Sequence, residues 1–216
     1  MGPLNGIKVL EFSGIGPGPY CGMLLADLGA DVIRLSRVSE KGAHNKFDIH
    51  NRSKRTIVAD LKNPKAIKEI KKIIKEVDVL FEGYRPGVME KLGLSPEKCL
   101  KLNESLVYGR MTGWGQDGPM SKQAGHDINY ISLSGALNAI GDQNSNPSIP
   151  LNLIGDYGGG GMMLAMGILA GVISSSKTGK GQVIDSAMID GSLSLMSFFY
   201  SLKEMGIWKD ERKSNF

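Results

Sequence analysis

Residues 7–35 read IKVLEFSGIGPGPYCGMLLADLGADVIRL and predict a strand, a tight turn, a helix and a second strand. Ile7–Phe12 is a short apolar run typical of a buried strand. The turn Ser13–Pro19 alternates glycine with proline, and the apolar segment after it predicts a helix that ends near Gly29. Asp31–Leu35 predicts the second strand. Such a β-α-β unit favours a parallel sheet with right-handed crossovers.

The same alternation continues through the first half of the chain, which predicts an α/β fold. Asn63 and Pro64 are a typical helix start, and the isoleucines that follow recur on one helical face. Ser95 and Pro96 predict another helix start. The remaining strands are expected at 56–58, 77–81 and 106–111.

Beyond Ser121 the pattern changes to longer helices. They are expected from Asp127, over 157–174 and over 185–205, with one more strand at 182–184.

Composition narrows the class of protein. The chain has 216 residues, 41% hydrophobic, 22% charged and a net charge of +4, which excludes a disordered chain. Its two cysteines, Cys21 and Cys99, lie far apart, so neither a disulfide framework nor a metal site is expected. The N-terminus has no secretory signal, and the longest apolar stretch, 161–173, is too short for a membrane span. We therefore expect a cytoplasmic protein.

A basic segment runs from Arg52 to Lys75. It holds nine basic residues and two acidic ones, and a solvated lysine-rich helix face explains most of them. Four cations precede the helix and could meet phosphates: Arg52, Lys54, Arg55 and Lys62. No aromatic residues are interleaved with the basic ones, so we expect no nucleic-acid partner.

The glycine turn GIGPGP superficially resembles a dinucleotide-binding loop. Its spacing argues against that function, because Pro19 and Tyr20 follow Gly18 where a third glycine is required.

Three histidines occur, and two of them, His44 and His50, lie in a polar loop where exposure is expected. His126 lies in the segment GHDINY at a predicted helix start. The positive end of a helix would favour a neutral, proton-accepting imidazole there. A cluster of capping residues is the competing interpretation.

Asp156 lies in LIGDYGGGG, between an apolar run and four glycines. It could simply be a helix N-cap. Four glycines are a costly way to begin a helix, at up to about 1 kcal/mol each, so we expect a need for close approach or movement. A carboxylate and an imidazole that converged on one carbon would suit removal and return of a proton α to a carbonyl.

Methionines in the predicted 157–174 helix have two interpretations. Met162, Met163 and Met166 could line an apolar binding surface, because methionine adapts to irregular shapes. Burial in an ordinary helix core is the preferred interpretation.

Several long motifs carry a resemblance to a known family. They are, in chain order, GIKVLEFSGIGPGPYCGMLLADLGADVIR, ADLKNP, EGYRPGVMEKLGL, RMTGWGQDGP, AGHDINYISLSG, PLNLIGDYGGGG and TGKGQVIDSAMIDG. Together they resemble the class III (CaiB/BaiF-like) CoA-transferase family, and within it the branch of acyl-CoA racemases. The resemblance implies a Rossmann-like large domain that binds CoA, over residues 1–185, and a helical segment, 186–216, leading toward a small domain.

The resemblance also implies a reaction and its residues. The reaction is inversion at the α-carbon of a 2-methyl-branched acyl-CoA through an enolate, with neither metal nor redox cofactor. His126 matches the base on one face of that carbon, and Asp156 matches the acid/base on the other. The expected CoA contacts are Arg37, Ala59, Asp60, Leu61, Lys62, Gly83, Tyr84, Arg85 and Lys91, and the thioester end is expected at Gly125, Asp127, Ile128, Asn129 and Tyr130. Lys91 stands where relatives often have arginine. Lysine keeps the positive charge but cannot make the bidentate contact with phosphate that arginine makes.

Family members continue with a small domain that this sequence does not contain. The resemblance implies an interlocked homodimer, or a complementing chain, and predicts weak or no activity for the 216 residues alone. Two alternatives stay open: a CoA-transferase in which Asp156 is the nucleophile, and an incomplete CoA-binding fragment.

Overall fold

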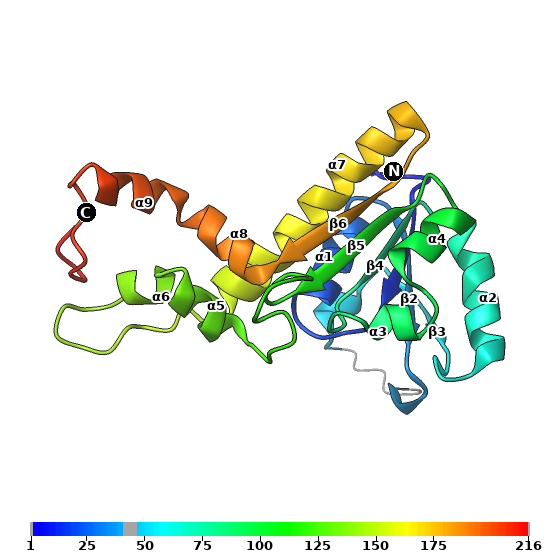
Figure 1. Ribbon diagram of the computed structural model, residues 1–216, viewed down its shortest axis with the longest axis horizontal. Coiled ribbons are helices and arrows are strands. Elements are labelled where there is room, and N and C mark those ends of the chain that lie inside the picture. Colours follow the sequence, from blue (N-terminus) through cyan, green and yellow to red (C-terminus); the bar gives the residue numbers. More distant parts are fainter. Residues whose placement is uncertain (1, 41–46, 216) are drawn as a thin grey trace.

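The computed structural model describes residues 2–40 and 47–215, and its centre is a six-stranded parallel sheet (Figure 1). The strand order is β3-β2-β1-β4-β5-β6, with every neighbouring pair parallel. In chain order the strands are β1 Lys8–Phe12, β2 Asp31–Ser36, β3 Arg55–Val58, β4 Val79–Glu82, β5 Val107–Thr112 and β6 Gln182–Ala187. This is the order of a Rossmann-like sheet, so the predicted fold class is confirmed.

Helices connect the strands and continue beyond the sheet. The α-helices are α1 Pro17–Asp27, α2 Pro64–Ile74, α3 Val88–Lys91, α4 Pro96–Leu102, α5 Asp127–Leu133, α6 Ala136–Ala139, α7 Met163–Thr178, α8 Met188–Leu195 and α9 Ser197–Glu204. Two single 3₁₀ turns are η1 Val38–Glu40 and η2 Ile49–Asn51. A wide-turn π-helix, η3 Leu153–Met162, runs directly into α7.

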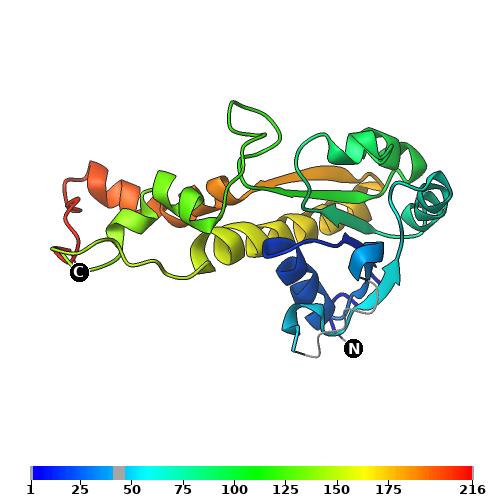
Figure 2. The same cartoon turned by 90° about the horizontal axis from the view of Figure 1, so that it is seen from below.

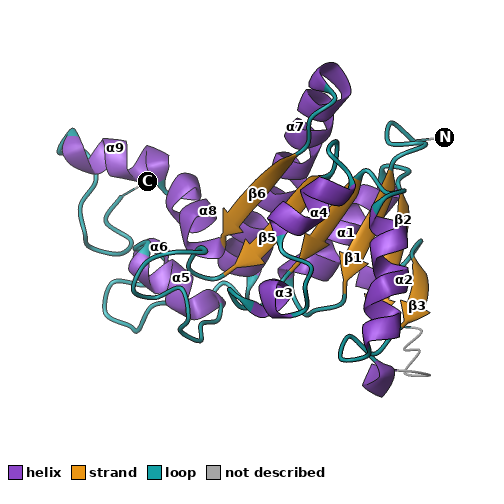
Figure 3. Cartoon of the chain, turned by 45° about the vertical axis from the view of Figure 1, so that its right-hand side comes forward, coloured by secondary structure: helices purple, strands orange, loops and turns teal. Residues whose placement is uncertain are grey.

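The sheet is covered on both faces (Figure 3). On one face Val9 and Phe81 pack with residues of α1 and α7, such as Leu25 and Ile168. On the other face α2, α3 and α4 pack on side chains of the opposite pleat. Since successive side chains of a strand point to opposite faces, this double cover explains the continuous apolar runs in the sequence.

Two helix starts have the predicted caps. The Asn63 side chain accepts a hydrogen bond from the backbone N–H of Lys65 at 2.9 Å, and Pro64 opens α2. Ser95 caps α4 in the same manner, accepting from the N–H of Lys98. Each cap satisfies an N–H group that has no partner inside the helix.

The glycine-rich helix begins earlier than the pattern predicts. Asn152 is its N-cap residue, and the expected start at Tyr157 lies one turn inside η3. The N-cap interpretation of Asp156 is therefore wrong. The expectation of close approach is confirmed, because a Cβ at Gly159 would lie 2.8 Å from the backbone nitrogen of Ser192 in α8, and one at Gly161 would lie 2.8 Å from the carbonyl oxygen of Pro17 in α1.

The C-terminal segment also differs from expectation. Strand β6 continues to Ala187, so the last helical region begins at Met188 rather than Asp185, and it breaks at Met196 into α8 and α9. The expected domain boundary at residue 185 falls inside β6. With α5 and α6, these two helices extend beyond one end of the sheet (Figures 1 and 2).

The continuous helix over residues 153–178 is long and apolar enough to cross a membrane, by length and composition alone. Core helices pass the same test, and this one packs on the sheet through Leu164 and Ile168, so it is no evidence for a membrane span. Met162 and Met166 are 53% and 61% exposed, so helix core is the wrong interpretation for these two methionines.

Candidate functional site

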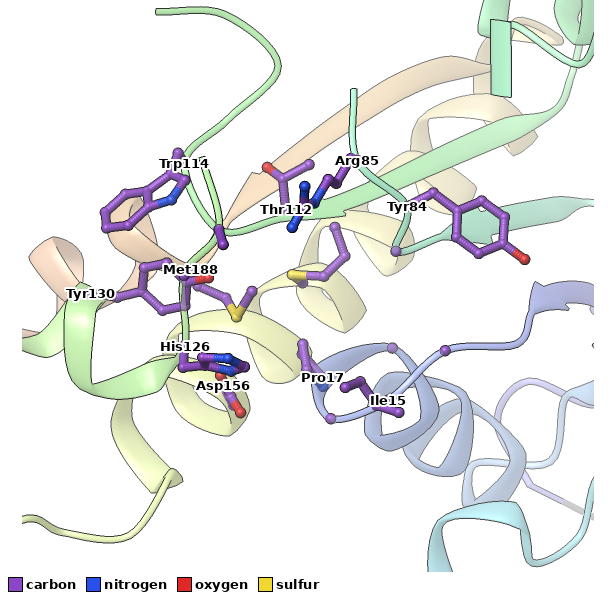
Figure 4. Close-up of a pocket in the computed structure, with 18 of the residues that line it drawn as sticks. Ile15, Pro17, Tyr84, Arg85, Thr112, Trp114, His126, Tyr130, Asp156 and Met188 are labelled. Atoms are coloured by element: carbon purple, nitrogen blue, oxygen red, sulfur yellow. The ribbon is translucent and has the colours of Figure 1, made fainter. Parts of the chain in front are cut away.

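A cavity of about 660 Å³ opens at the carboxyl edge of the sheet (Figure 4). The loops after β1, β4 and β5 line it, together with the starts of α5 and η3. Strand order reverses between β1 and β4, and ligands of such sheets bind at the carboxyl ends beside this reversal. Its volume is in the usual range for a small-molecule site.

The glycine-proline turn after β1 forms one wall. Gly16 has φ +67°, a left-handed conformation that favours glycine, and Pro17 opens α1. A Cβ at Gly16 would lie 3.5 Å from Oδ2 of Asp156. This is an ordinary contact distance, so the turn touches η3 of the same chain, and the positive φ of Gly16 rather than lack of space favours glycine there.

His126 is the N-cap residue of α5 and lines the cavity with an exposed side chain. Its backbone is extended, and its N–H donates to Oδ1 of Asn129 at 2.9 Å. The predicted helix start is therefore confirmed. The capping hydrogen bond joins the backbone N–H of His126 to the Asn129 side chain and does not use the imidazole.

Asp156 lies in the first turn of η3 and lines the same cavity with a half-buried side chain. Its Oδ2 accepts a hydrogen bond from Nδ2 of Asn152 at 3.1 Å. Figure 4 draws Asp156 and His126 together at one part of the cavity wall, away from Arg85 and Tyr84. A proton acceptor and a carboxylate thus border one space.

Asp127, next to His126, has its carboxylate under the start of η3. Its Oδ2 accepts hydrogen bonds from the backbone N–H of Gly155 at 2.6 Å and of Asp156 at 2.8 Å. Burial raises the pKa of Asp127 above its ordinary value, and the two N–H donors lower it in part.

The expected CoA contacts fall into two groups. Six border the cavity: Arg37, Gly83, Tyr84, Arg85, Gly125 and Tyr130. The guanidinium of Arg37 lies 5.6 Å from the ring centre of Tyr84, in cation-π contact.

The second group does not border the cavity. Residues 59–62 follow β3 at the same edge of the sheet, with Ala59 and Leu61 packed on the core and Oδ1 of Asp60 accepting from the N–H of Lys62. Lys91 is exposed at the end of α3. The others are on α5, where Ile128 and Asn129 are exposed and Asp127 is buried.

The structure pairs three of the four cations near β3 with carboxylates, and it buries one of the three. Lys54 has a fully buried side chain, with Nζ 2.7 Å from Oε2 of Glu11. Arg52 pairs with Asp27, and Arg55 pairs with Asp31 where β2 begins. Acidic partners from sequence-distant elements neutralise these cations, which the local pattern could not reveal.

His50 is half-buried rather than exposed. Its ring packs edge-on against Tyr20 of α1 and Tyr157 of η3, at centroid distances of 5.8 and 5.5 Å. His44 lies outside the described residues. Within the described ranges no group of three or more His, Cys, Asp or Glu side chains could hold a metal ion.

Residues 4–214 match the sequence profile of CoA-transferase family III. The chain belongs to this family. It is 45% identical to α-methylacyl-CoA racemase of Mus musculus and 44% identical to that of Homo sapiens, in both cases over 98% of the chain and 55% of the relative. The chain thus spans about half the length of the curated relatives it matches.

A solved family structure has the same fold. The crystal structure of a CAIB/BAIF family protein from Brucella suis matches 98% of this chain and 60% of that one, with a TM-score of 0.88 and 28% identity. The parallel sheet described above is therefore the fold of family III.

Sequence reasoning missed several cavity residues of this family III chain. Trp114 packs edge-on against Tyr130 at 4.7 Å, and Gly113 and Gly125 make room for the Tyr130 ring. The GWG sequence directly after β5 could have indicated this aromatic pair. Ile15 also lines the cavity and is 88% exposed at the tip of the glycine-proline turn. Nothing in the sequence around it indicates that position.

Proposed function

We propose that the chain forms the CoA-binding part of a racemase that inverts the α-carbon of 2-methyl-branched acyl-CoA thioesters. One observation carries the proposal: His126 and Asp156 border a single cavity that also holds the cations Arg37 and Arg85. The names of its mouse and human relatives support the same reaction.

The proposed reaction needs only proton transfers. The thioester carbonyl acidifies the α-hydrogen, and the imidazole of His126 takes that proton while the C–H electron pair forms the enolate. The carboxylic acid of Asp156 then returns a proton to the opposite face, which inverts the centre. The reverse direction exchanges the two roles. A preorganised N–H donor would stabilise the enolate oxygen.

A second function remains open because the family is one of CoA-transferases. In a transferase the Asp156 carboxylate would attack the thioester carbonyl, forming a mixed anhydride and releasing the CoA thiolate. An imidazole at the position of His126 is needed by the racemase and is not needed by the transferase. His126 therefore favours the racemase.

Deuterium incorporation at the α-carbon of a 2-methylacyl-CoA in heavy water tests the proposal. The chain is compared with His126→Ala, Asp156→Ala and a version joined to the remaining part of the mouse relative, of which this chain spans 55%. Exchange that either substitution impairs supports racemisation. Acyl transfer without exchange in any version would assign Asp156 to nucleophilic attack instead. A chain that bound CoA but did neither would be a binding fragment.

A further inference from the structure

One buried carboxylate joins the two parts of the candidate site. Asp127 is 5% exposed, and its Oδ2 lies 2.6 Å from the backbone nitrogen of Gly155 and 2.8 Å from that of Asp156. The two segments that the sequence singles out, GHDINY and LIGDYGGGG, therefore meet at this carboxylate.

The contact has a physical basis in the start of η3. The first N–H groups of a helix have no partner inside it, and they carry partial positive charge that favours an anion. Asp127 takes two of these N–H groups with one oxygen. The contact requires glycine, because a Cβ at Gly155 would lie 2.7 Å from Oδ2 and 3.0 Å from Cγ of Asp127.

The same geometry removes the Asp127 side chain from ligand contact. It does not border the cavity, and its Oδ1 is buried without a hydrogen-bond partner within the described residues. The carboxylate therefore acts on the site through the backbone of η3.

We propose that Asp127 is a positioning residue that fixes Asp156 relative to His126; this inference rests on the proposed function. His126 is the N-cap of α5 and Asp127 is its first residue, so one helix start carries both the imidazole and the acceptor of the Asp156 N–H. Two proton carriers that work on opposite faces of one carbon need such a fixed separation.

The proposal predicts an effect on one enantiomer. Without the Asp127 carboxylate, the turn that carries Asp156 loses its anchor, while His126 keeps its place at the cavity. Proton removal by Asp156 should fail, and removal by His126 should continue. A general loss of folding would lower both equally.

The test measures α-deuterium exchange of the separate R and S thioesters in heavy water. It uses the chain by itself and joined to the remaining part of the mouse relative, each at a concentration equal to that of the thioester. Asp156→Ala identifies the enantiomer that depends on Asp156. We expect Asp127→Ala to lose exchange of that enantiomer on the order of 10- to 100-fold, with little change for the other. Asp127→Asn keeps an acceptor oxygen and should restore most of it. Asp117→Ala, an exposed aspartate outside the cavity, is the matched control.

Equal loss for both enantiomers in folded Asp127→Ala would overturn the proposal, as would an Asn variant as impaired as the Ala variant. If Asp127→Ala does not fold by circular dichroism, Gly155→Ala replaces it, because its methyl group displaces the carboxylate and should give the same selective loss.

A second readout is independent of turnover. The amide ¹H–¹⁵N resonances of Gly155 and Asp156 should shift in Asp127→Ala and stay near their positions in Asp127→Asn. Amides that do not respond to Asp127→Ala overturn the proposal. If neither the unsubstituted chain nor its version joined to the remaining part of the mouse relative exchanges either enantiomer, the proposed function fails, and the amides still decide whether Asp127 holds η3.

Discussion

Lys54 and Glu11 form an ion pair whose two side chains are fully buried, with Nζ 2.7 Å from Oε2. Lys54 also donates to the carbonyl oxygen of Pro19, in the first turn of α1, at 2.8 Å. The pair therefore connects β1 and the residue before β3 to the glycine-proline turn that lines the cavity. Gly22 makes room for it, since a Cβ there would lie 2.0 Å from Oε2 of Glu11.

Lys54→Met should destabilise the fold strongly. It leaves the Glu11 carboxyl buried without its partner, and removing one member of a buried pair costs about 3–5 kcal/mol. The free energy of unfolding in urea measures the loss.

Arg52→Met is the matched control, because Arg52 pairs with Asp27 at the surface and exposed pairs contribute at most about 1 kcal/mol. The double variant Glu11→Leu, Lys54→Met should recover part of the loss, since an apolar pair needs no compensating charge. A Lys54→Met effect no larger than that of Arg52→Met would contradict the prediction.

The sequence does not predict this buried pair, although it predicts many local features of the fold. The β-α-β pattern, the caps at Asn63 and Ser95 and the start of α5 are local signals, and local periodicity and turn chemistry predict them. The burial of Lys54 depends on Glu11, which lies 43 positions earlier in the chain. Local charge patterns cannot distinguish a solvated lysine from one neutralised by a distant strand.

The candidate site has the same limit. The residue types and helix starts predict His126 and Asp156 as candidates, but their meeting in one cavity depends on packing. The side-chain role of Asp127 depends on the position of η3 against α5. The sequence does not predict the wide turns of η3. Its glycines permit α1 and α8 to pack closely on this helix, but glycine is compatible with many backbone conformations and does not specify a π-helix.

Glu82 should make stability depend on pH. Its carboxyl is 1% exposed and accepts hydrogen bonds from the N–H of Tyr84 at 2.7 Å and from Nε of Arg110 at 3.1 Å. Burial nevertheless raises the pKa of Glu82 to about 7 from 4.5, while those donors lower it in part. Between these two values the folded state holds a proton that the unfolded state has released. The stability contributed by Glu82 therefore falls as pH rises from about 4.5 to about 7.

Glu82→Gln removes this titration. Urea unfolding of both proteins across that interval should show the Gln variant gaining relative stability with rising pH, by at most about 3.5 kcal/mol at ~1.4 kcal/mol per pKa unit. Glu11, whose pKa burial raises to about 7, titrates in both proteins and cancels in the difference. A difference between the two proteins that stays constant with pH would refute the role of Glu82.

Gly191→Ala should separate α8 from η3. A Cβ at Gly191 would lie 1.8 Å from the carbonyl oxygen of Gly159, and a backbone atom cannot rotate away as a side chain can. Overpacking costs about 1–3 kcal/mol and more where the backbone must shift. Thermal unfolding should show a clear drop in Tm. Gly18→Ala in α1 is the control, because its Cβ meets nothing within 4 Å, and its Tm should stay or rise. Equal Tm values for the two variants would contradict the close packing.

Arg37→Ala should weaken binding of CoA, under the proposed function. Arg37 is exposed at the cavity, and its guanidinium is held over the ring of Tyr84. A planar cation fixed in this way can meet a phosphate with two parallel hydrogen bonds. Loss of a charged hydrogen bond of ~1.5 kcal/mol corresponds to about a tenfold rise in Kd. Titration calorimetry with CoA measures the change at low salt, where screening is weakest.

Arg37→Lys separates charge from geometry in the same titration. Lysine keeps the positive charge but has neither the planar fork nor the stacking of a guanidinium on an aromatic ring. Its Kd should therefore fall between those of the unsubstituted chain and Arg37→Ala. Lys98→Ala, an exposed cation on α4 outside the cavity, should bind CoA unchanged. If Lys98→Ala weakened binding as much as Arg37→Ala, CoA affinity would depend on net charge alone. The prediction that the cavity binds the CoA phosphates through Arg37 would then be refuted.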